Sequence, residues 1–258
     1  AYQVGRKAIA VNLSDLAAMA AKPEAVVVSV ALPRQNGRTI ADELFKGIIE
    51  ELEAFNTTLA GGDTNAWDGP LVISVTAIGS VSPWDCWRRN TAKPGDLLVV
   101  TGPLGGSLLG RHLNVTPRCH EALAIASKFQ VHAAIDISDG LAIDCSRLMS
   151  ASKTGAVIDI ESVPVHADAV SLSELKCNSS LTPIQHALQD GEDFELLLAI
   201  PPDDAHAFVG GDPQKIVPQT TMQPHIVGAV TEKTELLGRT ADGQTQPLEP
   251  KGFEHAFT

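Results

Sequence analysis

The chain has 258 residues, of which 44% are hydrophobic, and its 31 acidic and 19 basic side chains give a formal net charge of −12. This acidity, without any run of five or more Lys or Arg residues, argues against a nucleic-acid partner. No stretch approaches 18 uninterrupted apolar residues and no charged leader precedes an apolar segment, so we expect neither a membrane span nor a signal peptide.

The four cysteines indicate a reducing compartment rather than a metal site. They form no CxxC pair and have no histidine at a spacing typical of zinc ligands, and they are Cys86, Cys119, Cys145 and Cys177. We expect free thiols in a reducing cytoplasm. An acidic protein that binds an anionic ligand must neutralise both sets of charges, so a divalent cation, magnesium first, is expected.

The first part of the chain predicts alternating helices and strands. Apolar residues at positions 13, 16, 17 and 20 have the spacing of an amphipathic helix that ends near Lys22-Pro23. Residues 25–32 predict a buried strand, and residues 39–55 a long helix with Thr39 as its N-cap. The segment TTLAGGDT (57–64) predicts a strand ending in a glycine turn, and residues 71–81 a further strand.

Around Lys93-Pro94-Gly95 one series of elements gives way to another, and we place a domain boundary between residues 1–92 and 93–258. The second part again alternates, which predicts an α/β (α+β) fold of two domains. The expected elements are helices at 119–129 and 141–152, strands at 133–138, 155–160 and 194–200, and a last strand at 225–230. Residues 162–183 and 201–226 predict polar surface segments.

Two acidic positions lie in the first domain. Asp15 projects from the polar face of the first helix, opposite its apolar residues. Asp63 follows two glycines, and glycine allows the backbone to approach a phosphate closely. Taken alone, a solvated helix face is the better explanation of Asp15, and an ordinary turn explains Asp63 about as well as a ligand site does.

The segment AIDISDGLAID (134–144) places Asp136 and Asp139 on either side of Ser138, where a strand passes into a helix. We expect Ser138 to cap this helix while backbone amides at the helix start attract a phosphate. Two aspartates there would repel the phosphate unless a cation lay between them. The alternative is a capping aspartate and a turn aspartate. Asp144 adds an acid without an obvious basic partner.

A fourth acidic segment, QDGEDFELLLAI, places Glu192 and Asp193 directly before an apolar strand, although such runs are most often solvated turns. Other chemistries lack their motifs: no GxxxxGK[ST], GxGxxG, GxSxG or HExxH occurs. The glycine-rich segment TGPLGGSLLG (101–110) could line a phosphate or form ordinary turns.

The ordered set VNLSDLAAM, GGDT, R-x3-KPGD (89–96), DISDGL, GEDFEL and KGFEHAF resembles the thiamine-monophosphate kinase family of the AIR synthetase-like superfamily, over essentially the whole chain. The resemblance implies ATP-dependent phosphorylation of thiamine monophosphate to the diphosphate with several Mg²⁺ ions. It also implies a two-domain AIR synthetase-like fold and a homodimer whose N-terminal domains pair.

The resemblance assigns roles motif by motif. Magnesium ligands would be Asp15, Asp63, Asp136 and Asp139, and ATP would be bound by Gly62, Asp63, Arg89 and Ser138. Glu192 and Phe253 would bind the thiamine side of the substrate. The reaction would be an in-line attack by the substrate phosphate on the γ-phosphorus of ATP, which needs no strong general base.

The chain departs from the family pattern in two places. Pro250 stands where the family often has a tryptophan, so stacking on the thiamine ring would come from Phe253 or Trp67. The family's early GDD motif and Thr-Asp metal position would precede residue 1. Two alternatives therefore stay open: another AIR synthetase-like ATP-dependent enzyme, or a catalytically inactive nucleotide-binding homologue.

Overall fold

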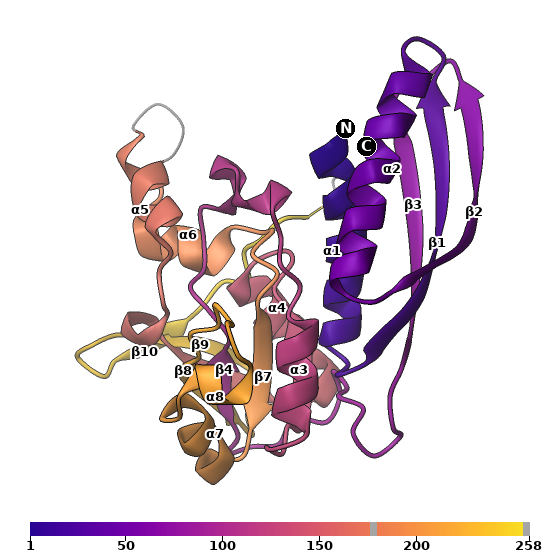
Figure 1. The fold of residues 1–258 in the computed structure, drawn as a ribbon. Coiled ribbons are helices and arrows are strands. Elements are labelled where there is room, and N and C mark those ends of the chain that lie inside the picture. The colour runs from indigo at the N-terminus through magenta and orange to yellow at the C-terminus, as the bar shows by residue number, and fades with distance from the viewer. Residues whose placement is uncertain (176–179, 255–258) are drawn as a thin grey trace.

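The computed structural model describes residues 1–175 and 180–254. These residues form a three-stranded sheet covered by two long helices and a larger seven-stranded sheet with several shorter helices (Figure 1). The predicted mixed α/β class is confirmed. Cys177 and residues 255–257 of the tail motif lie outside the described residues.

The first sheet has the strand order β2-β1-β3, with β1 and β2 parallel and β1 and β3 antiparallel. Its elements are α1 (Tyr2–Ala17), β1 (Lys22–Pro33), α2 (Gly37–Ala54), β2 (Thr58–Trp67) and β3 (Val72–Ser80). Both predicted helices and the strands at 25–32 and 71–81 are therefore present. The predicted end of the first helix near Lys22-Pro23 is wrong, because α1 ends at Ala17 and β1 begins at Lys22. Thr39 is not the N-cap of α2, because this helix begins earlier, after Asn36.

One face of this sheet is packed and the other is open. Val26, Val28 and Val30 of β1 are buried in a cluster with residues of α1 and α2. The intervening β1 residues point the other way, and the cross-strand register aligns them with exposed residues of β3, among them Val72 and Ile78. The apolar side chains on this open face are half exposed, at 46% for Val72 and 50% for Ile78.

The prediction that the second strand ends at a glycine turn is wrong. β2 continues through Gly61 and Gly62 to Trp67, and Gly62 pairs with Val28 of β1. A Cβ on Gly62 would lie 1.8 Å from the carbonyl oxygen of Val28. The glycine is therefore required for close packing of two strands.

The second sheet has the strand order β10-β9-β6-β8-β4-β7-β5. Its strands are β4 (Leu97–Val100), β5 (Ala133–Asp136), β6 (Gly155–Asp159), β7 (Leu196–Ile200), β8 (His225–Thr231), β9 (Leu236–Arg239) and β10 (Thr245–Pro247). The helices that follow β4 are α3 (Cys119–Ala126), α4 (Leu141–Ser152), α5 (Ala167–Glu174), α6 (Pro183–Gln189), α7 (Pro202–Val209) and α8 (Pro213–Ile216).

The predicted helices α3 and α4 and the predicted strands β5 to β8 are present, but the polar segments hold more structure than expected. Helices α5 to α8 lie in or beside the two regions predicted to be surface segments, and β9 and β10 follow the strand predicted to be last. These helices have four to eight residues each. Such short elements carry too few apolar positions for a periodic pattern to show.

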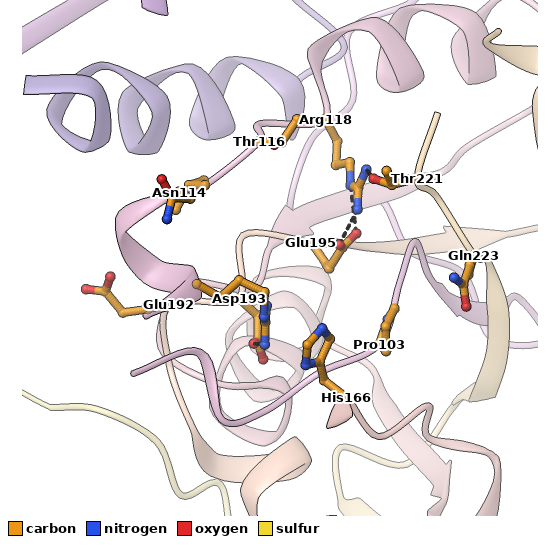
Figure 2. A pocket seen from close by; sticks show the side chains of 12 residues that line it. Pro103, Asn114, Thr116, Arg118, His166, Glu192, Asp193, Glu195, Thr221 and Gln223 are labelled. Atoms are coloured by element: carbon orange, nitrogen blue, oxygen red, sulfur yellow. Dashed lines mark hydrogen bonds and ion pairs between the residues drawn. The ribbon is translucent and has the colours of Figure 1, made fainter. Parts of the chain in front are cut away.

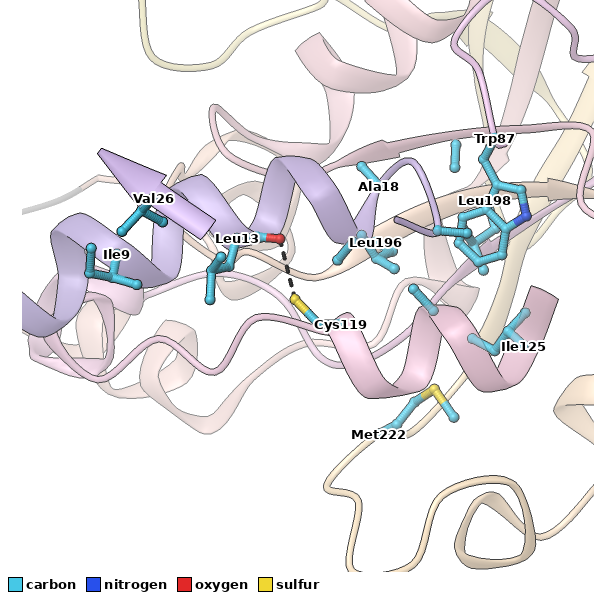
Figure 3. Packing of buried hydrophobic residues seen from close by; sticks show 14 of the residues in the cluster. Ile9, Leu13, Ala18, Val26, Trp87, Cys119, Ile125, Leu196, Leu198 and Met222 are labelled. Atoms are coloured by element: carbon cyan, nitrogen blue, oxygen red, sulfur yellow. Dashed lines mark hydrogen bonds between the residues drawn. The ribbon is translucent and has the colours of Figure 1, made fainter. Parts of the chain in front are cut away.

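Helix α1 lies between the two sheets and contributes to a core shared by both parts of the chain. Ile9 and Leu13 belong to the same buried cluster as Val26 of β1 and as Leu196 and Leu198 of β7 (Figure 3). Cys119 of α3 donates a hydrogen bond through Sγ to the carbonyl oxygen of Leu13, at 3.3 Å. The position of α1 is therefore fixed from both sides.

None of the helices within residues 1–175 and 180–254 is long and apolar enough to cross a membrane. Three of the four cysteines fall in these ranges, Cys86, Cys119 and Cys145, and all three are free thiols.

We predict that Gly62→Ala destabilises the protein by about 2 kcal/mol, because the added Cβ overlaps the backbone of β1. Gly37→Ala is the matched control, since its Cβ would meet Leu32 at an ordinary 3.5 Å. Urea unfolding of both variants measures the difference. Equal stability of the two variants would contradict the packing role of Gly62.

Candidate functional site

Two loops meet where β5 ends and β7 begins, because these strands pair antiparallel. We call residues 136–140 the DISDG loop and residues 191–193 the GED loop. Three backbone hydrogen bonds join the segments: Ile137 N to Glu195 O at 2.7 Å, Phe194 N to Ile137 O at 2.8 Å and Glu192 N to Ser138 O at 2.7 Å. Two motifs more than 50 residues apart thus form one structural unit.

Helix α1 brings two polar residues to the start of the DISDG loop. Asp136 is buried, and the hydroxyl of Ser14 donates a hydrogen bond to its Oδ2 at 2.9 Å. Burial, together with the negative charge of nearby Asp15, raises the pKa of Asp136 to about 6. Arg89 approaches the same group, with Nη2 lying 3.8 Å from Oδ1 of Asp15. Three of the predicted site residues therefore lie together.

The start of α4 differs from the expectation. Gly140 is its N-cap residue, and the predicted Ser138 cap is wrong. The buried carboxylate of Asp144 instead accepts hydrogen bonds from the backbone amides of residues 138, 139 and 140, at 3.1, 2.9 and 3.2 Å. These amides are satisfied within the chain, so they do not point at an external anion.

Arg147 is the basic partner that the sequence did not reveal for Asp144. Its Nη1 donates to Oδ1 of Asp144 at 2.7 Å and also to Oδ2 of Asp139. Position 147 is one helical turn after Asp144, so the pair follows the usual i, i+3 spacing. Asp139 is therefore neutralised by an arginine of α4, the helix that follows its loop.

Asp63 lies apart from these groups within one chain. It is exposed on β2 and pairs in register with Ser29, which places it on the open face of the first sheet, away from α1. Asn65 donates a hydrogen bond to it at 2.6 Å. Over residues 1–175 and 180–254, no group of three or more His, Cys, Asp or Glu side chains is close enough to hold a metal ion.

The three acids of GEDFEL have different surroundings. Asp193 is buried and accepts hydrogen bonds from Arg111 at 3.0 Å and from the amide of Gly105. Glu195 is buried and paired with Arg118 (Figure 2). Both acids therefore hold the fold together.

Glu192 is the more accessible acid of the segment. It lies at the rim of a cavity of about 260 Å³ that Arg118 and His166 also line, and its side chain points away from the Arg118–Glu195 pair (Figure 2). Its carboxylate pairs with Lys7 of α1.

The glycine-rich segment at 101–110 binds acids of the chain itself. Gly105 and Gly106 have φ values of +90° and +75° and donate their amides to Asp193 and Asp190. The alternative that this segment forms turns rather than a phosphate loop agrees with these contacts.

The tail passes beside the DISDG loop. The amide of Phe253 donates a hydrogen bond to the carbonyl oxygen of Asp139 at 2.9 Å, and the residue is 56% exposed. A Cβ on Gly252 would lie 2.5 Å from that carbonyl oxygen, so the tail needs glycine there. Trp67 lies instead at the end of β2, on the open face of the first sheet, where its Nε1 donates to the carbonyl oxygen of Pro70.

Sequence reasoning missed the basic residues of the site, namely Lys7, Arg111, Arg118 and Arg147. They occur singly, and each pairs with an acid whose position only the fold supplies. Two local signals existed, the i, i+3 spacings of Arg147 to Asp144 and of Arg118 to Glu121.

The chain matches two family models. The AIR synthase related protein N-terminal domain covers residues 1–81, and the corresponding C-terminal domain covers residues 93–236. Thiamine-monophosphate kinase of Rhodopirellula baltica is 42% identical over 255 residues, which is 99% of this chain and 77% of that protein. Thiamine-monophosphate kinase of Bacillus subtilis is 30% identical, over 98% of this chain and 81% of that protein.

Solved structures with similar names also align with this chain. AaThiL complexed with AMPPCP and TMP aligns with a TM-score of 0.82 at 27% identity, over 99% of this chain and 81% of that chain. Thiamine-monophosphate kinase from Stenotrophomonas maltophilia K279a aligns with 0.78 at 28% identity, over 94% and 79%. The hydrogenase maturation protein HypE of E. coli, at 17% identity and a TM-score of 0.80 over 96% and 80%, shares the fold alone.

We predict that Asp136→Asn gains stability relative to the wild type as the pH rises from about 4 to 7. The pKa of Asp136 is raised to about 6 in the folded protein. The protonated carboxyl of the wild type therefore contributes stability at low pH, and this contribution is lost as the pH rises through the folded pKa, whereas the Asn variant has no such loss. A shift of about two pKa units corresponds to about 2 to 3 kcal/mol. Urea unfolding in EDTA-containing buffer measures it, and a pH-independent difference would contradict the raised pKa.

Proposed function

This chain belongs to the thiamine-monophosphate kinase family and phosphorylates thiamine monophosphate with ATP, and we propose that the transfer takes place, with magnesium, where α1 meets the DISDG and GED loops. The observation that carries this location is the approach of Asp15 and Asp136, from two different elements, beside Arg89. Like charges held together at a strand end are suited to bind a cation that carries polyphosphate.

The residues fit magnesium by their chemistry. Asp136 is a buried carboxylate whose pKa is raised by burial and by Asp15, and a divalent cation would relieve both effects. Carboxylate oxygens are the hard ligands that Mg²⁺ prefers. We propose Asp15, Asp136 and Asp139, together with Asp63 of a second copy, as ligands of Mg²⁺ ions, which when bound would neutralise phosphate charge and polarise the γ-phosphoryl group.

Asp139 can join this set by exchanging one ion pair. Its carboxylate is held by Arg147, whose side chain is 42% exposed and also bonds Asp144. Since Asp144 keeps the arginine neutralised, Asp139 can turn to a cation without leaving Arg147 unpaired.

The nucleotide would lie on the Arg89 side. A guanidinium matches phosphate oxygens in a bidentate geometry, and Arg89 is partly exposed beside Asp15. Ser138, next to the two loop aspartates, and Gly62 and Asp63 of the GGDT segment complete the proposed ATP contacts.

The organic part of the substrate would lie on the Glu192 side. Glu192 is accessible at the cavity rim, and a carboxylate can bind the cationic, amine-bearing heterocycles of thiamine. Phe253 is fixed beside Asp139 through its backbone, and we propose that its aromatic side chain stacks on a thiamine ring.

The chemistry requires position more than proton transfer. The nucleophile is a phosphate oxygen that is already charged near neutral pH, so the residues need only align it in line with the γ-phosphorus. Catalysis then depends on bringing two polyanions together and stabilising the charge of the group in transfer.

We propose that two copies pair through the open face of the first sheet. This face carries half-exposed apolar side chains, including Val72 and Ile78, which a second copy would bury. The same face carries Asp63, so pairing would place this residue at the interface between copies. A homodimer thus provides a route by which the fourth aspartate reaches a site.

We propose two domains, residues 1–92 and 93–258. In support, the first family model ends at residue 81 and the second begins at residue 93, and each of the two sheets lies within one part. We propose a cytoplasmic location, where ATP is available and the thiols of Cys86, Cys119 and Cys145 stay reduced.

Turnover tests the proposed function. We expect the protein to convert thiamine monophosphate and ATP to thiamine diphosphate and ADP with Mg²⁺ and not with EDTA. Asp136→Asn and Asp139→Asn should each lower kcat by about a hundredfold or more, because charge at the transferring group is less well stabilised. Chromatography of the products measures this, with Asp203→Asn on α7 as a surface control. Full activity of the two loop variants would refute the assignment.

Association tests the dimer. Ile78→Glu places a charge on the open sheet face, and we expect it to shift the protein to monomers in sedimentation velocity. Leu108→Glu, at a 62% exposed residue outside that sheet, should leave the dimer intact. A dimer that tolerates Ile78→Glu would place the interface elsewhere.

A further inference from the structure

Glu192 is held by a residue from the other part of the chain. The Nζ of Lys7 in α1 pairs with Oε2 of Glu192, and the two side chains are 24% and 35% exposed. Partial burial limits screening by water and makes the pair more effective than one at the surface. Among the described residues no hydrogen bond or ion pair is made to Oε1, so this atom can accept a hydrogen bond from a ligand.

Lys7 belongs to one stripe of α1 that faces the second part of the chain. At i+3 from it, Ala10 packs in a small buried cluster with Val115 and Phe194, and at i+7 Ser14 bonds Asp136. Residues seven apart are about 10 Å apart along a helix axis. The stripe therefore contacts the GED loop at one end and the DISDG loop at the other, a span comparable to an extended thiamine monophosphate.

The GED loop and the residue that follows it are held in a strained conformation. Glu192 and Phe194 have φ values of +70° and +52°, in the left-handed region that residues other than glycine rarely adopt. The backbone is fixed there by the bonds of Glu192 to Ser138 and of Phe194 to Ile137. Such strain collects at functional sites, where the surroundings enforce it. The fold thus fixes the backbone of Glu192, and Lys7 fixes its side chain.

We propose that Lys7 is a positioning residue for thiamine monophosphate: it holds one oxygen of Glu192 and so presents the other to the amine-bearing heterocycle. The inference rests on the proposed function of this site. The neighbouring acids Asp193 and Glu195 already have their own arginines, Arg111 and Arg118, so the charge of Lys7 serves Glu192.

Substrate binding and kinetics test this role. Lys7→Met frees the Glu192 side chain, and ordering it again on binding should raise the Kd of thiamine monophosphate about tenfold, measured by calorimetry without ATP. The KM for thiamine monophosphate should rise likewise, while kcat and the KM for ATP stay within about twofold. Lys7→Arg should keep wild-type affinity. Lys7→Gln serves the same comparison if Lys7→Met is unstable.

A double-mutant cycle with Glu192→Gln separates positioning from a structural effect. If Lys7 acts through Glu192, the Lys7→Met/Glu192→Gln variant should bind no more weakly than Glu192→Gln alone. Lys46→Met, which removes a positive charge from α2, is the matched control and should bind normally. Additive losses, an unchanged Kd in Lys7→Met, or a loss confined to ATP would overturn the inference.

The outcomes for the wild type distinguish this inference from the function itself. Wild-type protein that binds thiamine monophosphate but does not turn it over would refute the proposed function and leave the Lys7 result standing. Wild-type protein that does not bind thiamine monophosphate would overturn both.

Discussion

The burial of α1 between two sheets is the constraint on which the site depends. One side of this helix packs with β1 and the other with β7 and α3, where Leu13 accepts a hydrogen bond from Cys119 (Figure 3). Because both sides are buried, the helix can neither rotate nor slide without opening apolar contacts to water. Ser14 and Asp15 are consequently fixed against the DISDG loop, and charges from separate parts of the chain share one position.

Electrostatics then divides the acids into two kinds. Asp144, Asp193 and Glu195 are buried with an arginine each and stabilise loops, as expected where an unpaired buried charge would be costly. Asp15 and Asp136 instead lie together. A protein of net charge −12 that binds polyphosphate has to offset like charges, and we propose that cations held by these two carboxylates do so.

Much of the fold could be predicted from the sequence, and the features of the site that could not have physical causes. Long periodic elements such as α2 and α4 and the apolar strands follow from local patterns. The partners of buried acids do not, since Lys7 meets Glu192 only after the chain has folded. From the sequence, the GGDT glycines are explained equally well by close approach to a phosphate and by an ordinary turn. Only the contact of Gly62 with Val28 in the structure shows that glycine is needed there for strand packing. Asp63 was expected beside the other aspartates, but the register of β2 places it on the opposite face.

The central claim is that carboxylates gathered at the end of β5 hold divalent cations that recruit the nucleotide. Equilibrium binding of a non-hydrolysable ATP analogue, titrated with and without Mg²⁺, tests it most directly. The account predicts affinity at least about tenfold higher with Mg²⁺, and loss of that gain when Asp15 and Asp136 are both changed to Asn. Binding that is indifferent to Mg²⁺, or a gain that survives the double substitution, would contradict it.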